Sequence, residues 1–194
     1  MTIPPETYAA LDIPQPVAGR ILEIRRRQRD DFRLALPAEV TLVGSSGVGC
    51  FATDQTAAAV FDVLHTIANS TAPIVTSLGQ VIRFPDSDVF AFEFSDESGP
   101  CHLHQRIVES GLRFQENRWP YSPHCTLRSR SPVTAREARS LFAERIEDSF
   151  VLDQLSVYQL EDDPRGRLPV LCHLLFRALL HSDRQRPVDL PAGE

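Results

Sequence analysis

The chain has 194 residues, of which 42% are apolar and 24% charged, a balance that fits a soluble globular protein and excludes a disordered chain or a coiled coil. Its formal charge of −6 excludes a surface that holds long nucleic acid without sequence preference, so local groups must bind any phosphate ligand. All 20 basic residues are arginines, which excludes a Walker-type phosphate lysine, a Schiff base and a lysine-adenylylated ligase intermediate.

The cysteines and the apolar runs bear on where the protein works. Its 4 cysteines include no C-x-x-C pair, and no secretion signal precedes them. No apolar run reaches the roughly twenty residues that a membrane span needs. We therefore expect a cytoplasmic protein with reduced thiols and no membrane partner, and we take a monomer as the default oligomeric state.

The first half of the chain alternates strands and helices. Apolar residues recur at helical spacing after Pro16, and again after two candidate helix caps, Thr53 and Asp54. Arg25, Arg26, Arg27 and Arg29 are expected to form a solvated side of the first helix. We predict strands over 8–13, 39–43 and 74–84, the last with a possible break at Gly79, helices over 17–32 and from the caps to residue 68, and a loop over 44–49.

The second half repeats this alternation. Thr134 and Glu137 have the spacing of a capping box, which favours a helix start at that point. An Asp-Asp-Pro-Arg-Gly sequence is typical of a turn. We predict strands over 89–94, 124–128, 150–160 and 168–179, helices over 99–112 and 134–146, a turn over 162–166, and a polar, proline-rich tail over 182–194.

The two halves resemble each other in the order of their elements. Residues 8–84 and 89–160 both read as strand, helix, strand, helix, strand. Chance alternation in an α+β chain explains this equally well, but the third elements also match in residue detail, as Glu39-Val-Thr-Leu and His124-Cys-Thr-Leu. We therefore predict a duplicated unit, with one bilobed domain over 1–181 whose lobes mix residues 8–84 and 89–179.

The matching strands carry the candidate chemistry. Side chains alternate along a strand, so His124, Thr126 and Arg128 share one face, and Glu39 and Thr41 share the corresponding face of the other strand. Equivalent positions in two lobes would bring two proton-exchanging groups and two hydroxyls to one cleft. In-line displacement at phosphorus needs a base at the entering oxygen and an acid at the leaving one.

Pro123-His-Cys-Thr-Leu127, which follows Trp119-Pro120, together with the duplicated layout resembles the 2H phosphoesterase superfamily, that is, the 2′-5′ RNA ligase and RNA 2′,3′-cyclic phosphodiesterase-like proteins, whose signature is a pair of His-x-Thr motifs. The resemblance covers nearly the whole chain. It implies an α+β fold in which two antiparallel sheets face a V-shaped central groove with helices outside. It also implies His124 as an acid or base and Thr126 and Thr41 as ligands of phosphate oxygens, without metal or cofactor.

The chain departs from that pattern at Glu39, which stands where the family has its first histidine. A carboxylate repels a phosphodiester unless burial raises its pKa or an arginine compensates its charge. Glutamate and histidine nevertheless work as base and acid in the guanyl-specific microbial ribonucleases. Two readings follow: a competent pair of Glu39 and His124, or a site that binds a ligand without turnover.

Other residues of interest lie close to the motif. Arg128 is a candidate for a bidentate phosphate clamp, with Arg130 a weaker one. Trp119 and Tyr121 are candidates for stacking a nucleobase. The amides of the 44–49 loop are candidates for an anion cradle. His102 and His104 are expected at the surface or in packing.

We thus expect a metal-independent phosphodiesterase acting on a small 2′,3′-cyclic phosphate or a 2′-5′-linked nucleotide or RNA end. ATP-independent ligation would be the reverse reaction. The alternatives are a nucleotide-binding or RNA-end-binding module of the same fold without turnover, and an unrelated α/β domain in which His124 merely ends a core strand.

Overall fold

The computed structural model describes residues 1–130, 132–162 and 170–181. Within them, strands and helices alternate along the sequence. In chain order the elements are β1 (Thr7–Asp12), α1 (Val17–Arg27), α2 (Asp31–Leu34), β2 (Glu39–Val43), α3 (Ala57–Asn69), β3 (Ile74–Arg83), β4 (Phe90–Phe94), α4 (Ser98–Val108), β5 (His124–Arg128), α5 (Ala135–Phe142), β6 (Ser149–Leu152), β7 (Gln154–Glu161) and β8 (Leu171–Leu179).

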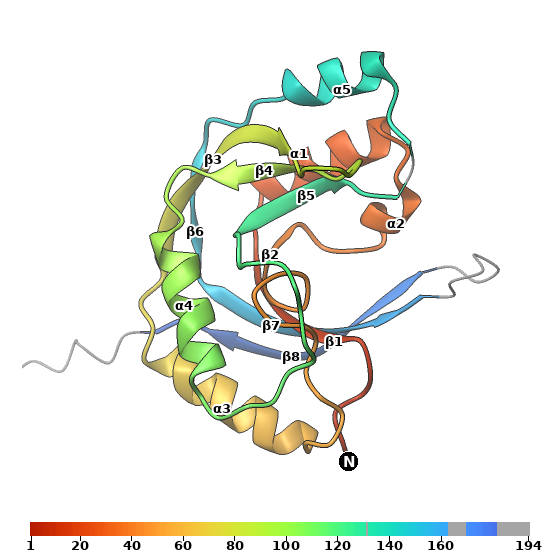
Figure 1. Cartoon of the computed structure of the whole chain (residues 1–194). Coiled ribbons are helices and arrows are strands. Elements are labelled where there is room, and N and C mark those ends of the chain that lie inside the picture. Colours follow the sequence, from red (N-terminus) through yellow and green to blue (C-terminus); the bar gives the residue numbers. More distant parts are fainter. Residues whose placement is uncertain (131, 163–169, 182–194) are drawn as a thin grey trace, which may run out of the picture.

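The strands form two four-stranded antiparallel sheets, with the orders β2-β1-β7-β8 and β5-β4-β3-β6. The predicted α+β fold with two antiparallel sheets is therefore confirmed. β2 and β5 are the edge strands of their sheets and contact each other (Figure 1). The two strands that carry the candidate motifs consequently meet where the sheets meet.

Both halves of the sequence contribute to each layer. The early helices α1 and α2 pack on β5, and α5 packs on β3, whereas α3 packs on β8 and α4 on β2 (Figure 1). The chain therefore passes repeatedly from one sheet to the other. The boundary of the domain at 181 stays a prediction, and the tail over 182–194 lies outside the described residues, as does most of the turn predicted over 162–166.

The two motif-bearing strand pairs have the same register. Both pairs are antiparallel, and each contains a bulge on its second strand, where Leu42 of β2 lies opposite the step from Ala9 to Ala10 and Leu127 of β5 lies opposite the step from Phe90 to Ala91. The matching cross-strand positions are Ala10 with Thr41 and Asp12 with Glu39 in the first pair, and Ala91 with Thr126 and Glu93 with His124 in the second. The repeat noticed in the sequence is thus a repeat of backbone pairing.

The prediction of one strand over 150–160 is wrong. β6 pairs with β3 in one sheet and β7 pairs with β1 and β8 in the other, with Asp153 between them. The Asp153 carbonyl accepts the N–H of Leu180 at 2.7 Å, which ties the crossing point to the end of β8. Buried residues continue through both strands, so the apolar pattern does not reveal the change of sheet.

Two helix boundaries also differ from prediction. The helix predicted over 17–32 is divided: α1 ends at Arg27, Arg29 adopts a φ of 55°, and the Asp30 side chain caps α2. The helix after residue 54 is capped by Thr56 rather than by Thr53 or Asp54, since the Thr56 hydroxyl accepts the N–H of Ala59 at 3.2 Å.

For the other two helices, the predicted first residues agree with the structure better than the predicted last residues. The capping box of Thr134 and Glu137 is confirmed at α5, which ends at Phe142 rather than at residue 146. α4 ends at Val108, and Gly111 follows with a φ of 85°. β3 continues past Gly79, where the pairing with β4 shifts register instead of breaking.

The core confirms the predicted alternation of side chains. Val40 and Leu42 of β2, and Cys125 and Leu127 of β5, are buried in one hydrophobic cluster. Their neighbours in the sequence consequently lie on the opposite faces of these strands. Among the described residues, no helix combines the length and the apolar character needed to span a bilayer.

Candidate functional site

Glu39 and His124 begin the two neighbouring edge strands, and Thr41 and Thr126 follow two positions later. Because β2 and β5 contact each other, the structure brings the four predicted residues to the junction of the two sheets. The carboxylate of Glu39 also helps to raise the pKa of the Cys125 thiol, next to His124, although burial is the main cause of that shift.

Glu39 is a buried carboxyl group, 5% exposed, on the face of β2 opposite the main core. The Tyr8 hydroxyl donates a hydrogen bond to its Oε2 at 3.0 Å. Burial raises the pKa of Glu39 to about 7, and Asp12 on β1 adds to the rise, while Arg25, Arg33 and the Tyr8 bond act against it. The carboxyl group therefore exchanges its proton near neutral pH.

His124 is half-buried, and its ring meets the ring of Phe84 edge-on, with 4.8 Å between the centroids. Its Nδ1 lies 2.7 Å from the carbonyl oxygen of Ser122. A carbonyl accepts only, so Nδ1 carries the proton in the neutral ring and Nε2 keeps its lone pair. Burial lowers the pKa of His124 below its ordinary 6.5, the Ser122 bond opposes this, and Arg33 adds to the lowering.

The two threonines are held through their backbones. Arg25 donates from Nε at 3.0 Å and from Nη2 at 2.8 Å to the Thr126 carbonyl, and the Tyr121 hydroxyl donates to the Thr41 carbonyl at 3.2 Å. Neither threonine hydroxyl bonds to another group of the described residues. Both hydroxyls consequently keep their hydrogen-bonding capacity, on strands that are fixed in place.

Arg25 was expected on a solvated helix face, and that expectation is wrong, because it is only 1% exposed. It follows Ile21 by four residues and so shares the buried face of α1, which is the signal that the sequence offered. Its guanidinium connects α2, the approach to β2, and β5. Its acceptors are the carbonyls of Arg33, Leu36, Pro37 and Thr126 and the Cys125 sulfur.

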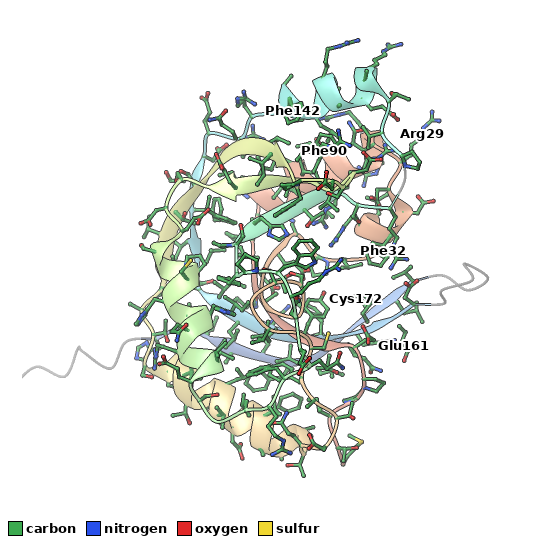
Figure 2. The ribbon with its side chains drawn as sticks, viewed as in Figure 1. Arg29, Phe32, Phe90, Phe142, Glu161 and Cys172 are labelled. Carbon is green, nitrogen blue, oxygen red and sulfur yellow. The ribbon has the colours of Figure 1, made fainter. Side chains whose placement is uncertain are left out.

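Arg33 on α2 is a second charged residue of the site that the sequence did not reveal. Its Nε donates to the Ser129 hydroxyl at 2.8 Å, and its charge acts on both Glu39 and His124. α2 is a single turn whose place depends on its contact with β5, so local periodicity carries no signal for Arg33. Figure 2 shows its neighbour Phe32 on α2, above the end of β8 that carries Cys172.

Arg128, the candidate phosphate clamp, is buried and bonded to other parts of the chain. Its Nη1 donates to the Gln28 carbonyl at 2.7 Å, its Nη2 donates to the Pro132 carbonyl at 3.1 Å, and it pairs with Glu137. These contacts tie the end of α1 to the start of α5. Arg128 would have to leave them to reach a ligand, so its assignment to the phosphate stays a prediction that the geometry does not favour.

The stacking candidates differ in their access to a ligand. The Tyr121 ring lies flat against the His104 ring, with 3.7 Å between centroids, so one of its faces is covered. His104 thus serves in packing, one of the two roles expected for it, and its Nδ1 lies 2.6 Å from the Leu42 carbonyl oxygen. Trp119 is 56% exposed beside the Arg118 guanidinium and remains accessible.

The loop over 44–49 holds this packing together. The N–H of Gly47 donates to the Trp119 carbonyl at 2.8 Å, and Gly47 has a φ of 74°. A Cβ there would lie 2.5 Å from Cε1 of His104. The loop is therefore closely fitted against the approach to β5, and its predicted use as an anion cradle stays untested.

For a metal, the described part of the chain offers no group of three or more His, Cys, Asp or Glu side chains placed to hold an ion. The chemistry available at the junction is that of one carboxyl group, one imidazole, two hydroxyls and two guanidinium groups.

In a comparison with protein families, the model of the 2′-5′ RNA ligase superfamily matches residues 13–164. Among proteins with curated descriptions, none matches the chain.

Several solved structures are similar over almost the whole chain. The protein TT0787 of Thermus thermophilus is 20% identical, with a TM-score of 0.62 and coverage of 91% of this chain and 98% of that one. E. coli LigT complexed with 3′-AMP is 18% identical, with a TM-score of 0.56 and coverage of 90% and 97%. A structure described as a phosphoesterase is 20% identical, with a TM-score of 0.56 and coverage of 92% and 99%. At these identities the likeness establishes the fold.

Proposed function

Since the chain belongs to the 2′-5′ RNA ligase superfamily, we propose that it is a phosphodiesterase that hydrolyses a 2′,3′-cyclic phosphate or a 2′-5′-linked nucleotide, with Glu39 and His124 exchanging the protons. Glu39 takes the place of the family's first His-x-Thr histidine. Thr41 and Thr126 hold the phosphate oxygens. Acid and base come from side chains of the chain, without a metal.

One observation carries this proposal: an acid whose pKa is raised to about 7 and an imidazole whose pKa is lowered start two adjoining strands. Catalytic acids and bases work best when their pKa values lie near the working pH. The uncharged carboxyl group is an acid and the uncharged imidazole is a base. At neutral pH a large share of the molecules therefore holds both groups in the forms that catalysis needs.

The proposed reaction is an in-line displacement at phosphorus. Nε2 of His124 accepts a proton from water as the water oxygen forms a bond to phosphorus. One ester P–O bond of the cyclic phosphate breaks, and the leaving ribose oxygen takes the proton of Glu39. The threonine hydroxyls donate to the non-bridging oxygens, whose negative charge grows in the transition state. A second proton exchange with water restores both side chains.

A carboxylate in place of a histidine raises the question of repulsion. Two features reduce it: Glu39 holds its proton up to about pH 7, and Arg25 and Arg33 supply positive charge around it. Similar structures add support for the ligand class, because E. coli LigT is described as complexed with 3′-AMP, with ATP and with phosphate.

A second candidate function is binding of a nucleotide or RNA end without turnover. The observation that favours it is the confinement of Glu39, which is buried and bonded to Tyr8. A carboxyl group held in this way would preserve the shape of the site without meeting a leaving oxygen. Exposed Trp119 would serve either function by stacking a base.

The test is hydrolysis of 2′,3′-cyclic nucleotides by the wild type and by the variants Glu39→Gln and His124→Ala. We expect each variant to lose about 10²- to 10⁴-fold in kcat, the usual contribution of a general acid or base. The matched controls Glu23→Gln and His102→Ala, both exposed, should keep full activity. Activity that survives both site substitutions contradicts the assigned roles, and binding without hydrolysis by the wild type favours the second candidate.

A further inference from the structure

We propose that Arg33 is the arginine that binds the substrate phosphate, a role that rests on the proposed function and replaces the one expected for Arg128. Four arginines surround the motif strands: Arg25, Arg33, Arg128 and Arg130. Their hydrogen bonds differ, and Arg33 is the one whose terminal nitrogens remain suited to a ligand.

The backbone and the Nε atom of Arg33 are fixed by hydrogen bonds, whereas its terminal nitrogens are not. Its backbone N–H donates to Asp30 Oδ1 at 2.9 Å, and the other oxygen of Asp30 accepts the N–H of Ser129 at 2.7 Å. Its carbonyl accepts from Arg25 at 3.0 Å, and its Nε donates to the Ser129 hydroxyl. The base of the guanidinium is therefore fixed to the end of β5, close behind the His-x-Thr motif.

The two terminal nitrogens of Arg33 make no hydrogen bond within the described residues. The other three arginines are engaged elsewhere to different degrees. Arg25 uses all its nitrogens on carbonyls. Arg128 uses Nη1 and Nη2 on carbonyls, and its Nε is buried without a partner among the described residues. Arg130 pairs through Nη2 with Asp162 at 2.6 Å, which draws its guanidinium toward the end of β7. Arg33 thus keeps the pair of parallel N–H donors that suits two phosphate oxygens.

The electric field at the motif supports the same placement. Arg33 lowers the pKa of both Glu39 and His124, so its charge lies near both proposed proton-exchanging groups. A phosphorus atom between those groups would lie within the same field. Arg33 would then supply the positive charge that neutralises the phosphate, because the carboxyl group of Glu39 cannot supply one.

The test measures binding of inorganic phosphate and of 3′-AMP by calorimetry to the wild type, Arg33→Met, Arg33→Lys and Arg130→Met. Arg130 is the matched control, since both guanidinium groups lie over the Phe32 ring, 5.1 Å from its centroid for Arg33 and 3.4 Å for Arg130. We expect Arg33→Met to weaken both ligands about 10- to 100-fold, the range for loss of charged hydrogen bonds. Arg33→Lys should recover part of the loss, and Arg130→Met should change affinity less than about threefold.

A second measurement separates direct contact from an effect through Glu39. In a Glu39→Gln background, Arg33→Met should cost the same factor in phosphate affinity if Arg33 touches the phosphate, and none if it acts only on Glu39. If Arg33→Met fails to fold, Ser129→Ala is the alternative variant, because it removes the anchor of the Arg33 side chain and keeps the charge. We expect Ser129→Ala also to lower the affinity for phosphate. An NMR titration of His124 in Arg33→Met should show a raised pKa, which reports that the site is still assembled.

The outcomes distinguish the two proposals. If the wild type binds phosphate and 3′-AMP and Arg33→Met binds them equally well, the role of Arg33 is overturned and the proposed function stands. If the wild type neither binds nor hydrolyses nucleotides, the proposed function fails and this inference fails with it.

Discussion

The two motif-bearing strand pairs, β1 with β2 and β4 with β5, have the same backbone pairing, but one carries an acid and the other a base. Thr41 and Thr126 each face an alanine across the ladder, and Glu39 and His124 each face an acidic residue. The first pair presents a buried acid and the second a half-buried base. In both, loss of water favours the neutral form, which raises the pKa of the acid and lowers that of the base. One physical effect, applied to both halves, therefore prepares a proton donor and a proton acceptor.

The surroundings of the two groups differ more than their backbones do. Glu39 accepts a hydrogen bond from Tyr8, which packs with Ala10 and Tyr158 in a small cluster. The Tyr8 hydroxyl is also 3.6 Å from the Cys172 sulfur. His124 instead lies against Phe84 and bonds to a backbone carbonyl. Burial is the main cause of both pKa shifts, and the pKa of the acid is tuned in addition by several side chains that substitution can remove.

The largest effect is expected when Glu39 and His124 are both replaced. If Glu39 and His124 serve one reaction, the Glu39→Gln/His124→Ala double variant should lose no more than the worse single variant, about 10²- to 10⁴-fold in kcat. Single-turnover hydrolysis of a 2′,3′-cyclic nucleotide measures this. Losses that multiply would mean that the two halves act independently.

The link between the halves is tested by Arg25→Met. Its guanidinium bonds to groups of β5 and of the segment before β2, so its removal leaves several buried carbonyls without a donor. We expect the free energy of unfolding to fall by about 3 to 5 kcal/mol in urea. The exposed neighbour Arg26→Met should change it by less than about 0.5 kcal/mol. A small effect at Arg25 would show that the strand pairs hold together without it.

The pH dependence of stability distinguishes the acid from the base. Glu39 is protonated in both states below its ordinary pKa of 4.5, and as pH rises toward about 7 only the unfolded chain loses the proton. Folding therefore becomes less favourable by about 3 kcal/mol over that window. Burial of His124 acts in the opposite direction, with stability lost as pH falls through 6.5.

Urea denaturation of the wild type and of Glu39→Gln at about pH 5 and pH 8 isolates the carboxyl group. We expect Glu39→Gln to gain about 2 to 3 kcal/mol on the wild type between the two values, because glutamine does not titrate. His124→Ala should show no such gain. A difference that is constant with pH would mean that Glu39 is not held protonated by the fold.

The smallest expected effect comes from Tyr8→Phe, which removes the hydrogen bond to Glu39. That bond lowers the pKa of Glu39, so its loss should raise the pKa by up to about one unit. The alkaline limb of the kcat profile, where Glu39 loses its proton, should move upward by the same amount. Tyr158→Phe is the matched control, since its hydroxyl bonds to Asp12 instead. If the alkaline limb of the kcat profile does not move, its pKa belongs to a group other than Glu39.

Several features of the site could be predicted from residue patterns. Alternation along a strand separated Glu39 and Thr41 from the buried Val40 and Leu42, and the structure shows that separation. Arg25 was misjudged because the run of basic and polar residues over 25–29 suggested a solvated face, although its spacing from Ile21 places it inward. Arg33 gave no signal at all, since its position depends on Asp30 and Ser129, which are far apart in sequence.

The amino-acid sequence was enough to predict local features: the alternation of side chains along the strands, the capping box at Thr134, and two equivalent motifs in a repeated order of elements. These depend on interactions between residues a few positions apart. The folded chain was needed to show that β6 and β7 enter different sheets, that β2 and β5 meet, and that Arg25 and Arg33 lie around the motif. Burial and charge at a site depend on the groups that pack around it, and here those groups come from distant parts of the chain.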